Sequence, residues 1–272
     1  MQVAVQQAIS VMRARYFDPI TIGQIASEVF VSPFHFSRVF AKTIGVTPGH
    51  YLTAVRLFEA KRLLLTTQLT VADVVCSVGY SSVGTFTSRF TRAVGMTPTQ
   101  YRSPEVRRLL VATASDFHHV PSVAALRAAD SRCVERVPGT GTITGTIELP
   151  PAAVPATVLV GVFADRIPQC GPVAYTALTN TGSARLEIPN VPPGRWTVIA
   201  VSERTARRGA EVHVGTLQQP VAVTPGGATR VALRMRDLHP TDPPIAITLA
   251  SDIAPQRGSN DVTRRAALRV AA

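Results

Sequence analysis

The sequence carries one short unit twice. The first copy is "SPFHFSRVFAKTIGVTPGHY" at residues 32–51, and the second is "SSVGTFTSRFTRAVGMTPTQY" at residues 81–101. When the copies are aligned, their aromatic, glycine and threonine-proline positions coincide: Phe36 with Phe86, Phe40 with Phe90, Gly45 with Gly95, Thr47-Pro48 with Thr97-Pro98, and Tyr51 with Tyr101. A chain built this way is expected to contain two copies of one small helical substructure.

Strong helix signals flank each copy. Ser32 is a good N-cap with Pro33 at the first helical position, and Gly45 ends that helix. Thr47-Pro48 opens a long helix over 48–67, for which we expect this buried stripe: Leu52, Val55, Ala60, Leu63 and Leu64. The same reading predicts seven helices in residues 1–103, the others covering 3–15, 21–29, 32–44, 71–78, 82–94 and a short one from Thr97-Pro98.

The pattern changes after residue 103. Residues 104–140 have little clear period and contain three prolines, so we expect a linker, in part helical. From 141 to 249, runs that alternate apolar and polar residues between Pro or Gly turns predict an all-β antiparallel sandwich. Its strands are expected at 142–150, 156–165, 172–180, 184–191, 194–202, 210–218, 220–235 and 245–249. Residues 250–272 are expected to be a loosely ordered tail.

Charge and cysteine content restrict the partners and the compartment. With 28 basic residues against 17 acidic ones, the formal net charge of +11 favours a polyanionic partner. Three widely spaced cysteines, Cys76, Cys133 and Cys170, argue against a disulfide framework and a zinc site. We expect no cofactor and no metal, and we interpret His118-His119 as solvated surface. The start of the chain lacks signal-peptide features and the apolar runs are short, so a reduced, cytoplasmic protein without a membrane segment is expected.

Each repeated unit has the pattern of a helix-turn-helix, in which the second helix enters the major groove of DNA. Helical spacing turns one set of side chains inward against the first helix: Phe36, Val39 and Phe40 in the first copy, and Phe86, Phe90 and Val94 in the second. It turns another set outward: Phe34, Ser37, Arg38 and Ala41, and in the second copy Gly84, Thr87, Ser88 and Thr91, flanked by Val83 and Thr85. A plain helical bundle would show similar spacing, but Arg38 suits guanine and the basic residues around these helices suit phosphates.

Two such helices on one chain predict a particular mode of recognition. A single reading helix covers only a few base pairs, and dimeric regulators place two of them about one DNA turn apart. Here the helix over 48–67 would hold the two reading helices at a fixed spacing. One chain could thereby read two successive major grooves on one face of the duplex.

Residues 8–103 resemble the DNA-binding domain of the AraC/XylS family of transcription regulators. The resemblance rests on "IGQIA", "SPFHFSRVF", "GVTPGHYL", "RLFEAKRLL", "VADVV", "GYSS", "RF" and "GMTPTQYR". It implies that the base-facing residues are Phe34, Ser37, Arg38, Val83, Gly84, Thr87 and Ser88. Contacts to phosphate are expected from Lys42, Thr85, Arg89, Arg92 and Arg102. The family commonly has Arg where Ser88 stands, and Gly where Phe30 stands.

The second half resembles prealbumin-like or carboxypeptidase-regulatory-type sandwiches, through its strand rhythm and a "VPPG" turn. This domain order is the reverse of that in most members of the regulator family. Sensing a ligand, dimerisation and contact with another protein all remain open as its role.

The sequence therefore favours a sequence-specific transcription regulator that binds double-stranded DNA through residues 8–103. RNA polymerase and a small-molecule effector at the β-sandwich are further candidate partners, and the oligomeric state is open. A nonspecific architectural DNA-binding protein is the main alternative. An enzyme is not expected, because no catalytic motif is present, although DNA-repair methyltransferases combine a similar reader with a reactive cysteine, here Cys133 or Cys170. A carbohydrate-binding or adhesive module would need exposed aromatics, whereas Trp196, the single tryptophan, is expected in or beside the core.

Overall fold

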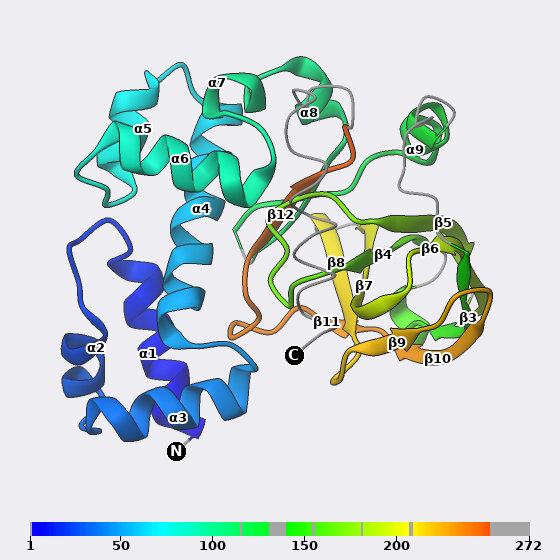
Figure 1. Ribbon diagram of the computed structural model, residues 1–272, viewed down its shortest axis with the longest axis horizontal. Coiled ribbons are helices and arrows are strands. Elements are labelled where there is room, and N and C mark those ends of the chain that lie inside the picture. Colours follow the sequence, from blue (N-terminus) through cyan, green and yellow to red (C-terminus); the bar gives the residue numbers. More distant parts are fainter. Residues whose placement is uncertain are drawn as a thin grey trace.

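The helices of residues 2–101 form one half of the molecule, and most of the strands form the other half. The computed structural model describes residues 2–114, 116–130, 140–153, 156–180, 182–206 and 209–250. Figure 1 shows the helical half, here called the reader, beside a strand-rich half, with β12 running between them. Cys133 and the tail after residue 250 lie outside the described residues.

The reader contains the seven predicted helices. They are α1 (Gln2–Ala14), α2 (Ile22–Glu28), α3 (Pro33–Ile44), α4 (Pro48–Thr66), α5 (Val71–Ser77), α6 (Val83–Val94) and α7 (Pro98–Tyr101). Thr21 and Thr70 start α2 and α5 with capping boxes, which satisfy backbone groups at the helix start. Gly45 and Gly95 end α3 and α6 with φ of 84° and 88°, a left-handed conformation that costs glycine little.

The aligned aromatic residues of the two copies form equivalent clusters. In the first copy Phe40 lies 5.6 Å from Phe36 and 5.6 Å from Tyr51, measured between ring centroids. In the second copy Phe90 lies 5.4 Å from Phe86 and 5.6 Å from Tyr101. All six rings are buried, so the repeat observed in the sequence is a repeat of two small cores.

Helix α4 is buried around most of its circumference, more than the predicted stripe implies. Leu52, Val55, Ala60 and Leu64 are buried as expected, and Leu63 is partly buried. The opposite side is also covered, because α4 lies between the two helix-turn-helix units and against the strand-rich half. Lys61 is therefore 0% exposed, which its residue type does not suggest.

The strand-rich half is a sandwich of two sheets. One sheet has the order β10-β3-β6, formed by β10 (Ala228–Arg234), β3 (Gly141–Glu148) and β6 (Ser183–Val191). The other has the order β11-β8-β7-β4-β5, formed by β11 (Arg236–Asp237), β8 (Gly209–Thr216), β7 (Gly194–Ala206), β4 (Ala156–Phe163) and β5 (Ala174–Asn180), with β9 (Val221–Val223) also pairing with β7. Trp196 is 3% exposed and packs in the core between the sheets, as expected.

One strand pairing departs from the predicted antiparallel sandwich. Strand β10 pairs with β3 in parallel, from Ala228 opposite Thr142 to Arg234 opposite Glu148. Before β10 the chain runs through β9, which pairs with β7 of the other sheet. Strand β10 is thus not joined to β3 by a hairpin, and it starts at the same end of the sheet as β3. The other pairings among the described strands are antiparallel.

Residues expected to form a linker build a junction instead. They contain α8 (Pro104–Arg108), β1 (Leu110–Thr113), β2 (His118–His119) and α9 (Val123–Asp130). Strand β12 (Ile245–Thr248), expected in the sandwich, pairs with β1 in a separate sheet of order β12-β1-β2.

The junction sheet is buried on both faces. Leu110, Ala112 and Ala246 face the core of the second helix-turn-helix unit. Val111, Ile245 and Ile247 face the outer side of the sandwich, where they meet residues of β4 and β7. A strand covered on both faces shows no polar alternation, which explains why residues 110–113 give no period in the sequence.

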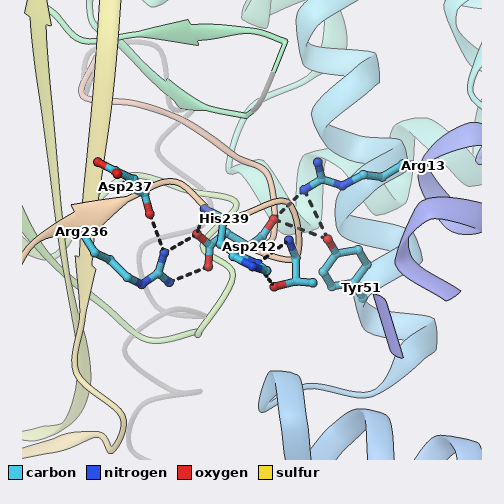
Figure 2. Close-up of polar contacts among 7 residues, drawn as sticks. Arg13, Tyr51, Arg236, Asp237, His239 and Asp242 are labelled. Carbon is cyan, nitrogen blue, oxygen red and sulfur yellow. Dashed lines mark hydrogen bonds and ion pairs between the residues drawn. The ribbon is translucent and has the colours of Figure 1, made fainter. Parts of the chain in front are cut away.

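The loop between β11 and β12 ties the sandwich to the first helix-turn-helix unit. Arg13 of α1 donates from Nη2 to the carbonyl oxygen of Asp242 at 2.6 Å. The Asp242 carboxylate in turn accepts two hydrogen bonds of 2.7 Å from the guanidinium of Arg236, and one of 2.7 Å from the His239 backbone. Figure 2 shows this chain of contacts, with Tyr51 beside Arg13. The reader and the sandwich are thus joined by specific contacts as well as by the junction sheet.

The part of the chain that the structure describes contains no helix long and apolar enough to span a bilayer.

Candidate nucleic-acid interface

The two second helices of the repeated units present their predicted outward faces. On α3, Phe34 is 80% exposed, Arg38 is exposed and Ser37 is partly exposed. The inward residues Phe36 and Phe40 are buried, and Val39 packs against the same core. The predicted division of α3 into a core face and an outward face is therefore confirmed.

Helix α6 repeats this arrangement. Val83 is 44% exposed, Gly84 and Ser88 are exposed, and Thr87 is partly exposed. Its inward residues Phe86, Phe90 and Val94 are buried. The Ser82 hydroxyl accepts from the backbone N–H of Thr85, which fixes the start of the helix and occupies that amide. The seven predicted base-facing residues thus divide between the outward faces of α3 and α6; their contacts with bases remain a prediction.

The basic residues of the reader fall into two groups. Those outside α3 and α6 are engaged by the protein through a hydrogen bond or an ion pair: Arg13, Arg15, Arg56, Lys61, Arg62 and Arg102, and the same holds for Arg107 and Arg108 of the adjoining α8. Within the described residues, Arg38, Lys42 and Arg92 make no such contact. The donors of the first group are used within the chain, whereas free guanidinium and ammonium groups on one surface are suited to phosphate or base edges.

Arg89 is positioned by an aromatic ring instead of by an acid. Its guanidinium carbon lies 5.9 Å from the centroid of the Tyr80 ring, and Tyr80 packs against Phe86 at 5.1 Å. A cation–π contact of this kind orients the side chain and leaves its charge uncompensated. Arg89 therefore remains able to contact an anion.

Arg102 differs from the other residues predicted to face phosphate. Its guanidinium donates to the carbonyl oxygens of Thr67, at 3.3 Å, and Leu69. These bonds close the connection between α4 and α5, so the donors of Arg102 are already used by the chain. Sequence spacing could not reveal this, because the partners lie 35 and 33 residues away.

The turn of the first unit contains an exposed aromatic residue in an unusual conformation. Phe30 has φ of 56° and is 97% exposed. This is the turn position for which the sequence resemblance implied Gly, and a bulky residue is strained there. The second unit uses Gly79 at φ of 77° in the equivalent turn.

The sequence analysis did not identify two residues that are important in the structure. Lys61 sits four residues after Leu57 and three before Leu64, so it lies on a buried side of α4; that spacing could have identified it. Arg195 lies across from α6 on the sandwich, and no local pattern indicates this proximity.

Of the two candidate nucleophiles, the one within the described residues is poorly suited to the role. Cys170 is exposed as a residue, yet surrounding protein desolvates its thiol and raises the pKa. A raised pKa disfavours the nucleophilic thiolate. His119 Nδ1 lies 2.7 Å from the carbonyl oxygen of Leu110, and the described residues contain no cluster of metal ligands.

Residues 25–104 match the model of the family described as a helix-turn-helix domain, in agreement with the AraC-type resemblance found in the sequence. Over 81 residues the chain is 38% identical to the HTH-type transcriptional regulator Rv1931c of Mycobacterium tuberculosis, covering 30% of this chain and 31% of that protein. It is 30% identical over 87 residues to the bifunctional transcriptional activator and DNA repair enzyme AdaA of Bacillus subtilis, covering 32% of this chain and 41% of that protein.

A solved structure covers the same part of the chain. The transcriptional regulator of Chromobacterium violaceum, described as containing an AraC-type DNA-binding domain, is 30% identical, with a TM-score of 0.36, covering 37% of this chain and 90% of that one. This chain spans about a third of the length of the curated relatives it matches first. The family match lies in the reader.

Proposed function

We propose that this protein is a transcription regulator that recognises a specific site in double-stranded DNA by placing α3 and α6 in two successive major grooves. The base contacts are assigned to Phe34, Ser37, Arg38, Val83, Gly84, Thr87 and Ser88. Lys42, Thr85, Arg89 and Arg92 are assigned to phosphates. Arg102 is assigned to support the α4–α5 connection, with at most a secondary part in phosphate binding.

The observation that supports this proposal most is the division of the basic residues. The reader uses its other cations internally, but it leaves Arg38, Lys42, Arg89 and Arg92 on the two second helices without an acidic partner among the described residues. A helical bundle with no polyanionic partner gives no reason for such a division. Electrostatic binding to phosphates does, and it would place free charge at the helices that enter the grooves.

Helix α4 supports the simultaneous use of both grooves. It has 19 residues, which corresponds to a length of about 28 Å. Successive major grooves on one face of DNA are about 34 Å apart. The two second helices belong to units at opposite ends of this rigid element, so a spacing on the scale of one DNA turn follows (Figure 1).

Selection from random oligonucleotides with the full chain, followed by footprinting of the selected site, tests this proposal. We expect a motif of two blocks separated by about one helical turn. One short block, or protection that is equal on all sequences, would contradict it. The full chain is the appropriate sample, because the core of the second unit continues through Val106, Leu110 and Ala246, beyond the reader.

A nonspecific architectural protein is the second candidate, since free basic residues alone would also give sequence-independent binding. Competition between the selected site and random DNA at stated salt separates the two. The relatives of the reader are mostly transcription regulators. A DNA-repair activity would require a reactive cysteine, Cys133 or Cys170, and the raised pKa of Cys170 disfavours that residue. A covalent methyl-transfer assay on the full chain would detect it.

A further inference from the structure

A cleft lies between the reader and the sandwich. Its volume is about 1440 Å³, and its walls come from three parts of the chain. Helix α6 forms one wall, the first half of α4 forms the floor, and the opposite wall consists of the loop after β4 and the start of β7. Clefts at the boundary of two domains are common positions for small-molecule sites.

The two walls are held at a fixed distance. In the loop after β4, Ile167 is 1% exposed and belongs to the core of the first helix-turn-helix unit. Two residues later, the backbone and side-chain carbonyl oxygens of Gln169 accept hydrogen bonds of 2.9 and 3.0 Å from Lys61 Nζ. The cleft is therefore a feature of the folded chain, since its sandwich wall is anchored in the reader.

The lining combines positive charge with apolar surface. Arg89 and Arg92 come from α6, Arg195 comes from β7, and Asp165 is the single carboxylate among the lining residues. Within the described part of the chain, the side chains of Arg92 and Arg195 form no ion pair or hydrogen bond. Ala93, Ala164 and Pro220 contribute apolar surface to the same cleft, and Leu57, Ile167 and Trp196 lie buried directly behind it. Guanidinium groups on opposite walls above an apolar floor suit a ligand that has an anionic group and an apolar body.

The cleft also overlaps the proposed DNA surface. Gly84 and Ser88, assigned to bases, and Thr85, Arg89 and Arg92, assigned to phosphates, all line it. An anion bound to Arg89 and Arg92 would neutralise the two positive charges that are assigned to DNA phosphates. Ligand and DNA would then weaken each other's binding by the same factor, as linkage requires.

We propose that this cleft binds a small organic anion with an apolar body, and that the bound anion excludes DNA from Arg89 and Arg92. The first half concerns the ligand alone, and the second half rests on the proposed function. Arg195 is the diagnostic residue, because it contacts the cleft from the sandwich and is not assigned to DNA.

Tryptophan fluorescence gives a direct readout, because Trp196 lines the cleft and is the single tryptophan of the chain. Octanoate is the probe, octanamide is its neutral counterpart, and sulfate is an anion without an apolar body. We expect a saturable fluorescence change with octanoate, and none with octanamide or sulfate at the same concentrations. Equal responses to octanoate and octanamide, or no saturable response to octanoate, would overturn the proposal.

Two matched variants locate the site. Arg195→Gln should raise the dissociation constant for octanoate at least about tenfold, because the sandwich wall of the cleft loses its guanidinium group. Arg230→Gln changes the same charge on an exposed strand of the sandwich outside the cleft, and it should bind octanoate like the wild type. Unchanged octanoate binding by Arg195→Gln would show that the ligand lies elsewhere and would refute the site.

The coupling to DNA is measured on the selected DNA site. Saturating octanoate should weaken binding of the wild type to that site on the order of tenfold, with little effect on Arg195→Gln at the same concentration. If Arg195→Gln binds DNA more weakly without any ligand, Arg195 belongs to the DNA surface and the cleft proposal fails. If the wild type binds octanoate but selects no DNA site, the proposed function fails while the anion site stands.

Discussion

Lys61 Nζ lies 2.6 Å from the carbonyl oxygen of Ala246, 185 residues later in the chain, and this hydrogen bond crosses from α4 to β12. With the two bonds to Gln169, three carbonyl oxygens surround one buried amine. The contact joins the reader, the junction sheet and the sandwich at a single atom. Its protonation is therefore linked to the stability of the whole assembly.

The pH dependence of stability should reveal this buried amine. Burial lowers the pKa of Lys61 from 10.5 to about 7, because desolvation disfavours the charged form. Between these two pKa values the unfolded chain binds more protons than the folded chain. The free energy of unfolding therefore increases as the pH rises from 7 towards 10.5, and decreases as the pH falls towards 7. We expect the free energy of unfolding of the wild type to rise relative to that of Lys61→Met, by at most about 1.4 kcal/mol per pH unit.

Denaturant unfolding of both proteins between pH 7 and pH 9 measures this difference. Lys42→Met is the control, because Lys42 is exposed on α3 and should show no such pH-dependent difference from the wild type. A wild-type minus Lys61→Met difference that stays flat over this range would show that Lys61 does not change its protonation there.

Arg38→Ala should relax specificity at one base pair. Arg38 is exposed on the outward face of α3 and is free to bind guanine O6 and N7 with two hydrogen bonds. Its loss should cost about 1–3 kcal/mol on the selected site and much less on a site mutated at the contacted pair. Binding to single-base variants of the site provides the measurement. An equal loss on all sequences would instead make Arg38 a phosphate contact.

Arg92→Ala and Arg102→Ala should have different effects, although both remove one positive charge. Arg92 is free, so its removal should lower DNA affinity evenly across sequences and reduce the slope of log K against log salt by about one unit. Arg102 donates to Thr67 and Leu69, so its removal should lower the melting temperature and change the slope less. Equal slopes for Arg92→Ala and the wild type would remove Arg92 from the phosphate contacts.

Phe40→Ala and Phe90→Ala should act through folding. Both side chains are 0% exposed at the centres of the two aromatic clusters, so each truncation should cost roughly 3–5 kcal/mol of unfolding free energy. Phe34→Ala, which removes an exposed ring from the same helix as Phe40, should leave thermal stability nearly unchanged. Similar melting temperatures for all three variants would show that the inward face is assigned incorrectly.

Phe30→Gly should stabilise the protein by about 0.5–1 kcal/mol. The left-handed φ of 56° costs a residue with a Cβ about 1–2 kcal/mol, and glycine avoids this cost. Part of the stabilisation is offset because glycine loses more backbone entropy on folding. The ring is 97% exposed, so little packing is lost. Phe30→Ala keeps the Cβ and serves as the comparison in thermal unfolding. If Gly and Ala give the same stability, the backbone at Phe30 is not strained.

The sequence was sufficient for the reader because its signals are local. Caps, helix-ending glycines and the spacing of Phe36, Phe40, Phe86 and Phe90 all lie within a few turns of one another, and the seven helices follow from them. The alternating strands of the sandwich were predictable for the same reason. The parallel pairing of β10 with β3 was not, because it depends on the path of the chain between two sheets.

Features that depend on distant partners escaped the sequence reading. Residues 110–113 look irregular until both cores that cover them are known. The sequence gives no reason to distinguish Arg102 from Arg92, because the carbonyl oxygens that bind Arg102 come from residues far away in the chain. The cleft combines residues from α4, α6 and the sandwich, which no local pattern could bring together.

The chain leaves the reader along β1 and returns to it along β12, its antiparallel neighbour. The sandwich is in this sense an inserted domain, tethered at both of its ends to one narrow ribbon. The hydrogen bonds of Lys61 to Gln169 and the packing of Ile167 in the first helix-turn-helix core hold this domain against the reader, so the fold itself sets the width of the cleft beside α6. The spacing of α3 and α6 is set separately, because the units that carry them both pack against α4.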